Sequence, residues 1–274
     1  MIDRYAVFGQ PIKHSKSPLI HSLFAKQTQQ TLSYVAQEVA AERFADEVKT
    51  FFAEGGKGLN CTVPLKELAF AYVEHKTERA ELAKAVNTLA LQADGRLLGD
   101  NTDGCGLVTD LITNHQVKIS GCRLLILGAG GAARGIMAPL LQQLPLALVI
   151  ANRSIDKALQ LAKEFADYGQ VSACGFEDLA GDGFDLILNA TSASLSGELP
   201  ALPNDLITGQ GVCYDLAYGN EPTPFVRWGQ AQGAKQSVDG LGMLVEQAAE
   251  AFYLWRGVRP ETRPVIEQLS KAGK

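Results

Sequence analysis

One stretch of the chain has the composition and the neighbours of a phosphate-binding turn. Residues 128–135 read GAGGAARG, directly after the apolar run 123–127 and directly before a helical pattern. Glycines at such a strand-to-helix turn let the backbone approach a pyrophosphate, which is attracted by the positive end of the helix. A G-x-G-x-x-A string alone is weak evidence, but here the required strand and helix flank it. The sequence therefore predicts a dinucleotide site rather than an ordinary glycine turn.

The end of the next predicted strand indicates which dinucleotide binds. NAD sites place an Asp or Glu about 20 residues after the glycines, where it holds the ribose 2′-hydroxyl. Here the run 146–151 ends in Asn152-Arg153-Ser154, without an acid. Arg153 offers a planar, permanently charged group suited to a phosphate, and Lys157 adds positive charge one helical turn later. We therefore expect NADP, with a solvated surface arginine as the alternative interpretation of Arg153.

Three polar strings have the side chains to bind a hydroxylated ligand. They read GQPIKHSKSP at 9–18, NCTVPLK at 60–66, and AVNT at 85–88 combined with GDNTDG at 99–104. We expect each string to follow a strand, where open α/β sheets form their ligand sites. Because Ser, Asn, Asp and Pro are also ordinary turn residues, no single string is decisive.

Composition excludes several classes of protein. The 274 residues carry a net charge of −5 and no Lys/Arg cluster, which argues against a nonspecific nucleic-acid binder. The apolar runs are too short to span a bilayer, and the first residues do not resemble a signal peptide. The five cysteines form no C-x-x-C, and the four histidines lack ligand-like spacing, so neither a disulfide framework nor a metal site is expected. We expect a cytoplasmic protein that binds small molecules.

Short apolar runs alternate with helical patterns, which is typical of an α/β fold with parallel sheets. In the first hundred residues we expect strands at 5–8, 32–39, 58–63, 88–92 and 96–98, and helices at 17–29 and 43–53. Asp94-Gly95 between two short apolar runs predicts a β-hairpin.

A second, more regular series begins near Arg123. We expect strands at 124–127, 147–150, 171–173, 186–188 and 212–216, a helix at 155–168 with Ser154 as its N-cap, and a last clear helix at 241–255. The change of pattern near Gly104 suggests a domain boundary there.

Taken together, these motifs resemble the shikimate dehydrogenase family over nearly the whole chain. The match continues with NRS at 152–154, NATS at 189–192, YDLAY at 214–218, DGLGML at 239–244 and a glutamine at 247. The resemblance implies a two-domain α/β fold with the active site in the cleft between the domains. An N-terminal α/β substrate domain would comprise 1–103 and 239–274, and a Rossmann-like NADP-binding domain would comprise 104–238.

The resemblance also implies roles for individual residues. Lys66 and Asp103 would transfer the proton, and which of them carries it is left open. The residues implied to bind substrate are Ser15, Ser17, Thr62, Asn87, Asp103, Tyr218 and Gln247. Those implied to hold NADP are Glu78, Gly128, Ala129, Gly130, Gly131, Ala132, Asn152, Arg153, Ser154, Lys157, Leu216 and Gly240.

The seat of the substrate carboxylate is expected at the start of the first helix. Ser17 precedes Pro18, and proline favours the first helical position, so we expect Ser17 to be the N-cap. The free N–H groups at a helix start attract an anion, and the Ser15 and Ser17 hydroxyls would complete the seat. Ser15 is expected to have no capping role.

The implied activity is the reversible NADPH-dependent reduction of 3-dehydroshikimate to shikimate in aromatic amino acid biosynthesis. Four positions depart from the usual pattern, and none of them removes a charge or hydrogen-bonding group from this scheme: Cys61, Leu65, Ser154 and Leu216. Two alternatives stay open: a quinate/shikimate dehydrogenase that uses both cofactors, and a non-catalytic metabolite sensor of the same fold. The sequence does not fix the oligomeric state, and a homodimer is one option.

Overall fold

The computed structural model describes residues 2–179 and 183–272, and it divides into two compact units. Unit 1 comprises Met1–Gly106 and Val245–Gln268, and unit 2 comprises Leu107–Leu244 and Leu269–Lys274. The three divisions fall inside helices α5 (Asp103–Thr109), α9 (Leu241–Arg256) and α10 (Arg263–Ala272). The functional domain boundaries, 103/104 and 238/239, stay a prediction.

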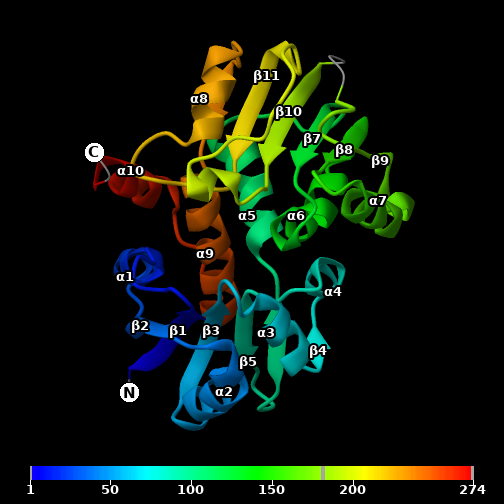
Figure 1. Cartoon of the computed structure of the whole chain (residues 1–274). Helices are drawn as coiled ribbons and strands as arrows, with labels where there is room; N and C mark the ends of the chain where they lie inside the picture. The colour runs from blue at the N-terminus through cyan, green and yellow to red at the C-terminus, as the bar shows by residue number, and fades with distance from the viewer. Residues whose placement is uncertain (1, 180–182, 273–274) are drawn as a thin grey trace. The chain divides into compact units, whose positions relative to one another are not determined.

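Unit 1 is built on a mixed sheet (Figure 1) with the strand order β2-β1-β3-β5-β6-β4. β5 runs antiparallel to both of its neighbours, and the other pairs are parallel. The expected hairpin is confirmed, with Gly95 at φ +84° in its turn. The strands are β1 (Asp3–Gly9), β2 (Leu32–Glu38), β3 (Gly56–Cys61), β4 (His75–Lys76), β5 (Thr88–Leu91) and β6 (Leu97–Asp100).

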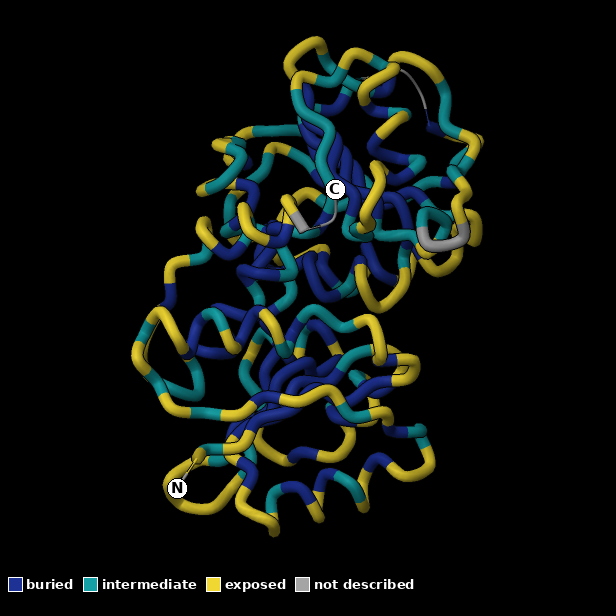
Figure 2. The backbone as a smooth tube through the Cα atoms, turned by 90° about the vertical axis from the view of Figure 1, so that its left-hand side faces the viewer, coloured by how far each residue is buried: buried dark blue, intermediate teal, exposed yellow. Residues whose placement is uncertain are grey.

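The helices of unit 1 cover a sheet whose buried faces are apolar. α2 turns Phe44, Val48 and Phe51 inward at helical spacing, and they join Phe8 and Leu59 of the sheet in one core cluster. Figure 2 shows this inner layer as the buried part of the backbone. Besides α5 and α9, the helices are α1 (Ser17–Gln27), α2 (Phe44–Ala53), α3 (Lys66–Tyr72) and α4 (Glu78–Ala83).

Unit 2 is built on a parallel sheet with the order β12-β11-β10-β7-β8-β9. Renumbered within the unit and read from β9, this is 3-2-1-4-5-6, the order of a doubly wound dinucleotide-binding sheet. The strands are β7 (Arg123–Leu127), β8 (Ala147–Ala151), β9 (Val171–Cys174), β10 (Phe184–Asn189), β11 (Ile207–Asp215) and β12 (Gln236–Val238). The helices are α6 (Gly131–Leu141), α7 (Ile155–Glu164) and α8 (Pro224–Ala231), together with a π-helical turn at Asp110–Asn114.

Several sequence expectations need correction. The helix at 241–255 is not the last, because α10 (Arg263–Ala272) follows it with a strongly amphipathic pattern that the sequence reading overlooked. The helix expected at 155–168 ends at Glu164 and continues only as a 3₁₀ turn at Ala166–Tyr168. Ser154 does stand at the N-cap of α7, but its hydroxyl makes no capping hydrogen bond.

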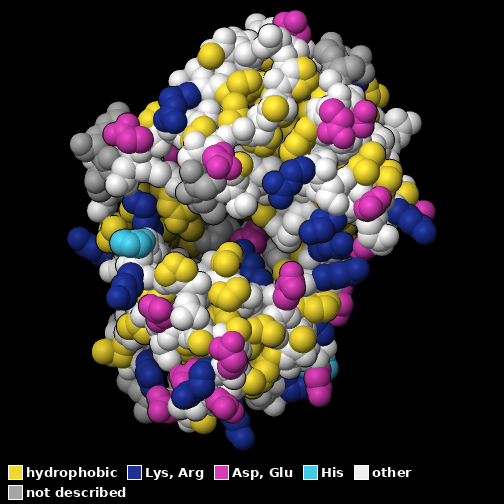
Figure 3. Space-filling view, viewed as in Figure 1, with side chains coloured by type: hydrophobic (Ala, Val, Ile, Leu, Met, Phe, Trp, Pro, Cys, Tyr) yellow, Lys and Arg dark blue, Asp and Glu magenta, His cyan; other side chains and the backbone are white. Residues whose placement is uncertain are grey.

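The surface in view has charges of both signs, and the cysteines form no disulfides. Figure 3 shows Lys/Arg and Asp/Glu side chains interspersed over the face in view. No helix in the described part of the chain is long and apolar enough to cross a membrane. All five cysteines are free thiols.

Candidate active site

The site of unit 1 lies at one edge of its mixed sheet. The ends of β1, β3 and β6 meet there, because these three strands run in the same direction. The start of β5 reaches the same edge because β5 is antiparallel, which pairs Thr88 with Asn60 on one side and Asp100 on the other. The expectation that each polar string follows a strand is therefore wrong for Asn87, which precedes β5. Because β5 is antiparallel to β3 and β6, the residue just before β5 lies at the same sheet edge as the residues that follow β3 and β6.

Lys66 and Asp103 form the ionic centre of this edge. Lys66 Nζ lies 2.6 Å from Asp103 Oδ2, and the two side chains are 29% and 19% exposed. Lys66 begins α3 and Asp103 begins α5, so both extend from helix starts that follow strand ends. The fully buried Leu65 anchors the turn before Lys66. The pair is thus held by backbone elements yet is open to a ligand.

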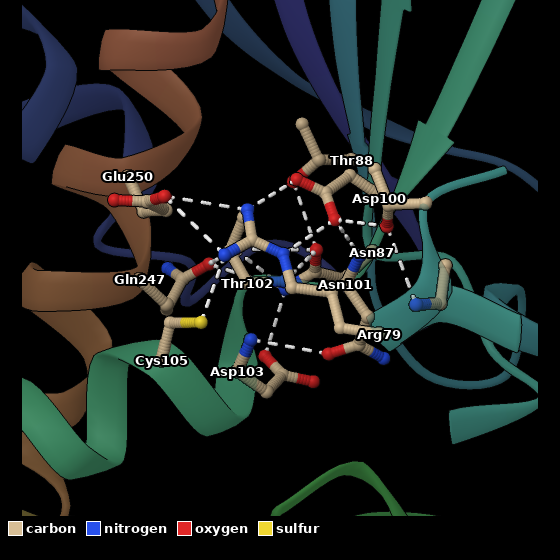
Figure 4. Close-up of polar contacts among 12 residues, drawn as sticks. Arg79, Asn87, Thr88, Asp100, Asn101, Thr102, Asp103, Cys105, Gln247 and Glu250 are labelled. Atoms are coloured by element: carbon tan, nitrogen blue, oxygen red, sulfur yellow. Dashed lines mark hydrogen bonds and ion pairs between the residues drawn. The ribbon is translucent and has the colours of Figure 1, made fainter. Parts of the chain in front are cut away.

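Asn87 organises the polar groups around Asp103, as Figure 4 shows. Its Nδ2 donates to Asp103 Oδ1 at 2.8 Å and to Thr102 Oγ1 at 3.0 Å. Its Oδ1 accepts from the Thr102 backbone N–H at 3.0 Å and from Thr88 Oγ1 at 2.8 Å. Asn87 is only 2% exposed, so these bonds lie in a region with little water. A satisfied buried network of this kind fixes side-chain orientations.

Gln247 joins the same group from α9. Its Oε1 lies 3.5 Å from Asn87 Nδ2 and 3.4 Å from Thr102 Oγ1. The close approach of α9 depends on Gly106, where a Cβ would stand 2.6 Å from the Gln247 backbone nitrogen. Sequence reasoning assigned no role to Gly106 or to Thr102, although both lie in or beside the GDNTDG string.

The start of α1 differs from expectation. Lys16, not Ser17, is the N-cap residue, and Ser17 is the first helical residue and is buried. Ser15 does take a capping role, because its Oγ accepts from the Ser17 backbone N–H at 3.3 Å. The expectation failed because Ile12 O binds the Ser15 N–H and turns the chain one residue earlier. Thr62 follows β3, and its methyl packs where a Cβ at Gly9 would stand.

A second ionic group lies beside the first and was missed. Arg79 Nε donates to Asp100 Oδ1 at 2.7 Å, and its Nη2 pairs with Asp100 Oδ2. Its guanidinium also reaches Glu250 Oε1 at 3.3 Å and Cys105 Sγ at 2.8 Å (Figure 4). Asp100 is 1% exposed, so the arginine neutralises a buried carboxylate at the start of the loop that carries Asp103. Lone charged residues without a known motif gave no signal in the sequence.

The glycine turn of unit 2 has the form that a pyrophosphate requires. Gly128 ends β7 at φ +104°, and α6 begins at Gly131 with Gly130 as its N-cap. A Cβ at Gly130 or Gly131 would meet nothing within 4 Å, so the space beside the turn on that side is open. Ala132 follows as an exposed residue of the same first turn, and Ala129 is partly exposed. The residues present therefore fit a dinucleotide phosphate.

The end of β8 supplies the positive charge expected for NADP. Arg153 and Lys157 are exposed, and within residues 2–179 and 183–272 neither forms an ion pair. Asn152 is held by its backbone N–H on Cys174 O and by its Nδ2 on Ser154 O, at 3.2 and 2.9 Å. No acid stands at the strand end itself, and the next carboxylate along the chain is Asp156 in the first turn of α7.

Asp215 organises the loops at the end of β10 and β11. This fully buried carboxylate accepts from Asn189 Nδ2 and the Ala217 N–H, each at 3.1 Å, and from Ser194 Oγ and Thr223 Oγ1, each at 2.6 Å. Leu216 follows directly. Sequence reasoning included Asp215 in the YDLAY string without giving it a role.

Leu216, Gly240 and Tyr218 are brought together in unit 2. A Cβ at Gly240 would stand 2.3 Å from Leu216 O, so only glycine allows this approach. Burial, with the nearby Asp239, raises the pKa of Tyr218, so its hydroxyl stays protonated. The predicted substrate residues thus fall in both units, and Glu78, the exposed first residue of α4, belongs to unit 1.

A buried carboxylate also fixes the start of α9. Asp110 Oδ2 accepts from Tyr214 Oη at 2.7 Å and lies 3.4 Å from His115 Nε2. Its carboxylate occupies the space where a Cβ at Gly242 would stand. The hydrogen bond with Asp110 raises the pKa of His115. Gly242, the second glycine in DGLGML, is therefore explained by its contact with the distant Asp110, which no local pattern reveals.

Comparison with known proteins gives matches along most of the chain. A model described as the shikimate dehydrogenase substrate binding domain matches residues 7–89. A model described as shikimate/quinate 5-dehydrogenase matches 110–196, and one described as the shikimate 5′-dehydrogenase C-terminal domain matches 240–269. A curated protein of Methylococcus capsulatus, named shikimate dehydrogenase (NADP(+)), is 62% identical over 97% of this chain and 96% of its own.

Solved structures agree with the architecture. The crystal structure of an Ael1 enzyme from Pseudomonas putida has a TM-score of 0.93 and 50% identity over 98% of both chains. Shikimate 5-dehydrogenase from Thermus thermophilus, solved in complex with NADP(H) and shikimate, has a TM-score of 0.87 and 33% identity over 100% of both chains. By its sequence, its two sheets and the residues gathered at their edges, the chain belongs to the shikimate dehydrogenase family.

Proposed function

We propose that this chain catalyses the reversible NADPH-dependent reduction of 3-dehydroshikimate to shikimate, with Lys66 and Asp103 handling the proton. The observation that carries the proposal is the Lys66–Asp103 pair, 2.6 Å apart and tied to Asn87. A metabolite sensor would gain nothing from holding an ammonium and a carboxylate in this arrangement beside amide and hydroxyl groups. The family membership and the NADP-type strand end support the same activity.

In the proposed mechanism, NADP supplies the hydride acceptor for the alcohol carbon. In the direction of reduction, the Lys66 ammonium gives a proton to the substrate's carbonyl oxygen as the hydride reaches its carbon, and the amine so formed takes the proton back when the alcohol is oxidised. Asp103 holds Lys66 through Oδ2, while Asn87 holds Asp103 through Oδ1. Orientation is thus fixed before substrate arrives, which lowers the reorganisation needed in the transition state.

The proposed substrate site uses neutral donors and acceptors around this pair. Ser15 and Ser17 receive the carboxylate. Tyr218 of unit 2 belongs to the same proposed set, and its raised pKa keeps its hydroxyl protonated. Thr62, Asn87 and Gln247 bind ring hydroxyls, together with Lys66 and Asp103.

The proposed NADP site combines backbone and charged groups. The glycine turn receives the pyrophosphate, Arg153 and Lys157 receive the 2′-phosphate, and Leu216 and Gly240 lie on the nicotinamide side. The full proposed set is Glu78, Gly128, Ala129, Gly130, Gly131, Ala132, Asn152, Arg153, Ser154, Lys157, Leu216 and Gly240.

Absorbance of reduced nicotinamide tests the activity directly. Purified protein is mixed with shikimate or quinate and with NADP or NAD, in all four combinations. We expect rapid reduction with shikimate and NADP, and reduction slower by about 10²–10⁴ in the Lys66→Ala variant. Equal rates with quinate and NAD would favour the dual-specificity alternative, and no reduction alongside tight shikimate binding would favour the sensor.

We also propose that the functional domains comprise 1–103 plus 239–274 and 104–238, and that the protein forms a homodimer. We further propose that it works in the cytoplasm. Free thiols at all five cysteines are compatible with the reducing conditions of the cytoplasm. Sedimentation velocity measures the oligomeric state, and a single monomer species at working concentration would overturn the dimer.

A further inference from the structure

Tyr34 of β2 lies between the proposed carboxylate seat and the proton-transfer pair. Its hydroxyl donates to Asn60 Oδ1 at 2.7 Å, and burial raises the Tyr34 pKa while the neighbouring Ser17 side chain lowers it in part. The residue is 9% exposed, so no bulk water competes for these bonds. Tyr34 belongs to none of the strings that the sequence singled out.

The direction of these hydrogen bonds follows from the donors and acceptors. Asn60 Nδ2 lies 3.0 Å from the Asn87 backbone carbonyl, which can only accept. The amide nitrogen of Asn60 therefore faces that carbonyl, and its oxygen must face Tyr34. A tyrosine hydroxyl has one proton, which Tyr34 gives to Asn60, so Ser17 is the donor to Tyr34.

The chain of bonds continues in the same direction to the catalytic centre. Asn60 Nδ2 donates to Thr88 Oγ1 at 2.9 Å, and Thr88 Oγ1 donates to Asn87 Oδ1 at 2.8 Å. Asn87 Nδ2 then donates to Asp103 Oδ1 at 2.8 Å, where Figure 4 shows the last links. Hydrogen bonds aligned head to tail in a dry interior polarise one another.

We propose that Tyr34 is a positioning residue that couples the carboxylate seat at Ser17 to the Lys66–Asp103 pair. The coupling rests on the site map of the proposed function. When the Ser17 hydroxyl turns to donate to a carboxylate, its lone pairs face Tyr34, and the single Tyr34 proton is shared between Ser17 and Asn60. Binding of a carboxylate at Ser17 thereby changes the hydrogen bonds of Asn60, Thr88 and Asn87, the last of which holds Asp103.

Packing around Tyr34 does not depend on the hydroxyl. The ring stacks on His21 with centroids 4.1 Å apart and planes at 7°. Burial lowers the pKa of His21 to about 3, so the stacked ring is neutral and adds no charge to the chain. A phenylalanine at position 34 keeps this stack and removes only the oxygen.

The test compares Tyr34→Phe with Tyr5→Phe, another buried tyrosine of unit 1 whose hydroxyl serves only Arg256 at 3.2 Å. Because one net hydrogen bond is worth about 1 kcal/mol, we expect Tyr34→Phe to lower kcat/KM for shikimate about fivefold, in both KM and kcat. KM for NADP should not change. Tyr5→Phe should leave all three constants unchanged. A Tyr34→Phe enzyme with the parent's shikimate kinetics would overturn the proposal. An equal rise in KM for NADP and for shikimate would also overturn it.

Double variants test the coupling itself. If Tyr34 acts through Ser17, the pair Ser17→Ala with Tyr34→Phe should be no worse than Ser17→Ala within about a factor of two. Thr62→Val with Tyr34→Phe should multiply the two single effects, because no side-chain hydrogen bond within the described residues joins Thr62 to this chain of residues. Multiplicative effects in both pairs would overturn the coupling. If Ser17→Ala leaves shikimate KM unchanged, the carboxylate seat is wrong and the proposed site map fails first.

Discussion

The two units differ in whether side chains or backbone groups form their candidate binding sites. In unit 1, the groups gathered at the sheet edge are side chains: Lys66, Asp103, Asn87 and Gln247, from four separate elements. In unit 2, the glycine turn offers backbone N–H groups at the start of α6, and side chains contribute chiefly at Arg153 and Lys157. A backbone site needs glycine at a few adjacent positions, whereas a side-chain site needs distant residues brought to one edge.

This difference sets how each site should respond to substitution. Removing one side chain in unit 1 deletes a chemical group while the sheet edge stays. Adding one methyl group in unit 2 fills the space that a phosphate would use. The predictions below test this contrast, beginning with the largest expected effect.

Lys66→Ala should abolish most of the activity while leaving the fold of unit 1 unchanged. Loss of a general acid/base typically lowers kcat by about 10²–10⁴. Shikimate KM should change far less, because the interaction matters chiefly in the transition state. Steady-state kinetics measure both, with the exposed Lys57→Ala as control. Near-normal kcat with a large rise in KM would move Lys66 from catalysis to ground-state binding.

Arg153→Ala should weaken NADP and spare NAD. Loss of a charge-assisted bond costs about 1.5–3 kcal/mol, which corresponds to about a ten- to hundredfold rise in KM. Lys163→Ala, an exposed lysine in the last turn of α7, which begins two residues after Arg153, is the control. Equal losses for NADP and NAD would mean that Arg153 does not contact the 2′-phosphate.

Gly130→Ala should damage cofactor binding without damaging stability. The backbone there has a φ of −91° and the added Cβ meets no protein atom within 4 Å, so the folded state tolerates it. We expect NADP KM to rise about tenfold, or about 1.4 kcal/mol, with an unchanged Tm. Gly240→Ala is the contrasting variant, since its Cβ would lie 2.3 Å from Leu216 O and should lower Tm. Unchanged NADP kinetics in Gly130→Ala would place the pyrophosphate elsewhere.

The smallest effect concerns two histidines with opposite pKa shifts. Burial lowers the pKa of His21 in unit 1 to about 3, so its stability contribution is lost as pH falls below about 6.5, where the unfolded state gains a proton. The bond to Asp110 raises the pKa of His115 in unit 2. Its contribution is full below about 6.5 and is lost as pH rises through the raised value.

Thermal unfolding across pH 4.5–8.5 separates the two. His115→Asn should flatten the decline of Tm on the alkaline side and leave the acid side unchanged, with each kcal/mol worth about 2–4 °C. His75→Asn, an exposed histidine in unit 1, should leave the whole profile unchanged. An alkaline decline of the same slope in His115→Asn and the parent would show that the His115–Asp110 pair does not contribute.

The sequence by itself determined the features that depend on neighbouring residues. The glycine turn, the missing acid after β8, the hairpin at Asp94-Gly95 and the alternation of strands and helices are all local patterns, and the structure has each of them. The amphipathic helix α10 was not predicted, and it follows α9 after residues 257–262.

Only the tertiary structure decided which distant residues meet. The antiparallel course of β5 brings Asn87 to the sheet edge at which β3 and β6 end. Tyr34 joins the hydrogen-bond network because β2 lies beside β1. The ion pair between Arg79 and Asp100, and the close packing of Asp110 against Gly242, are likewise contacts between remote segments. Local propensity carries no information about such contacts, since they form only when packing and burial have fixed the order of the strands.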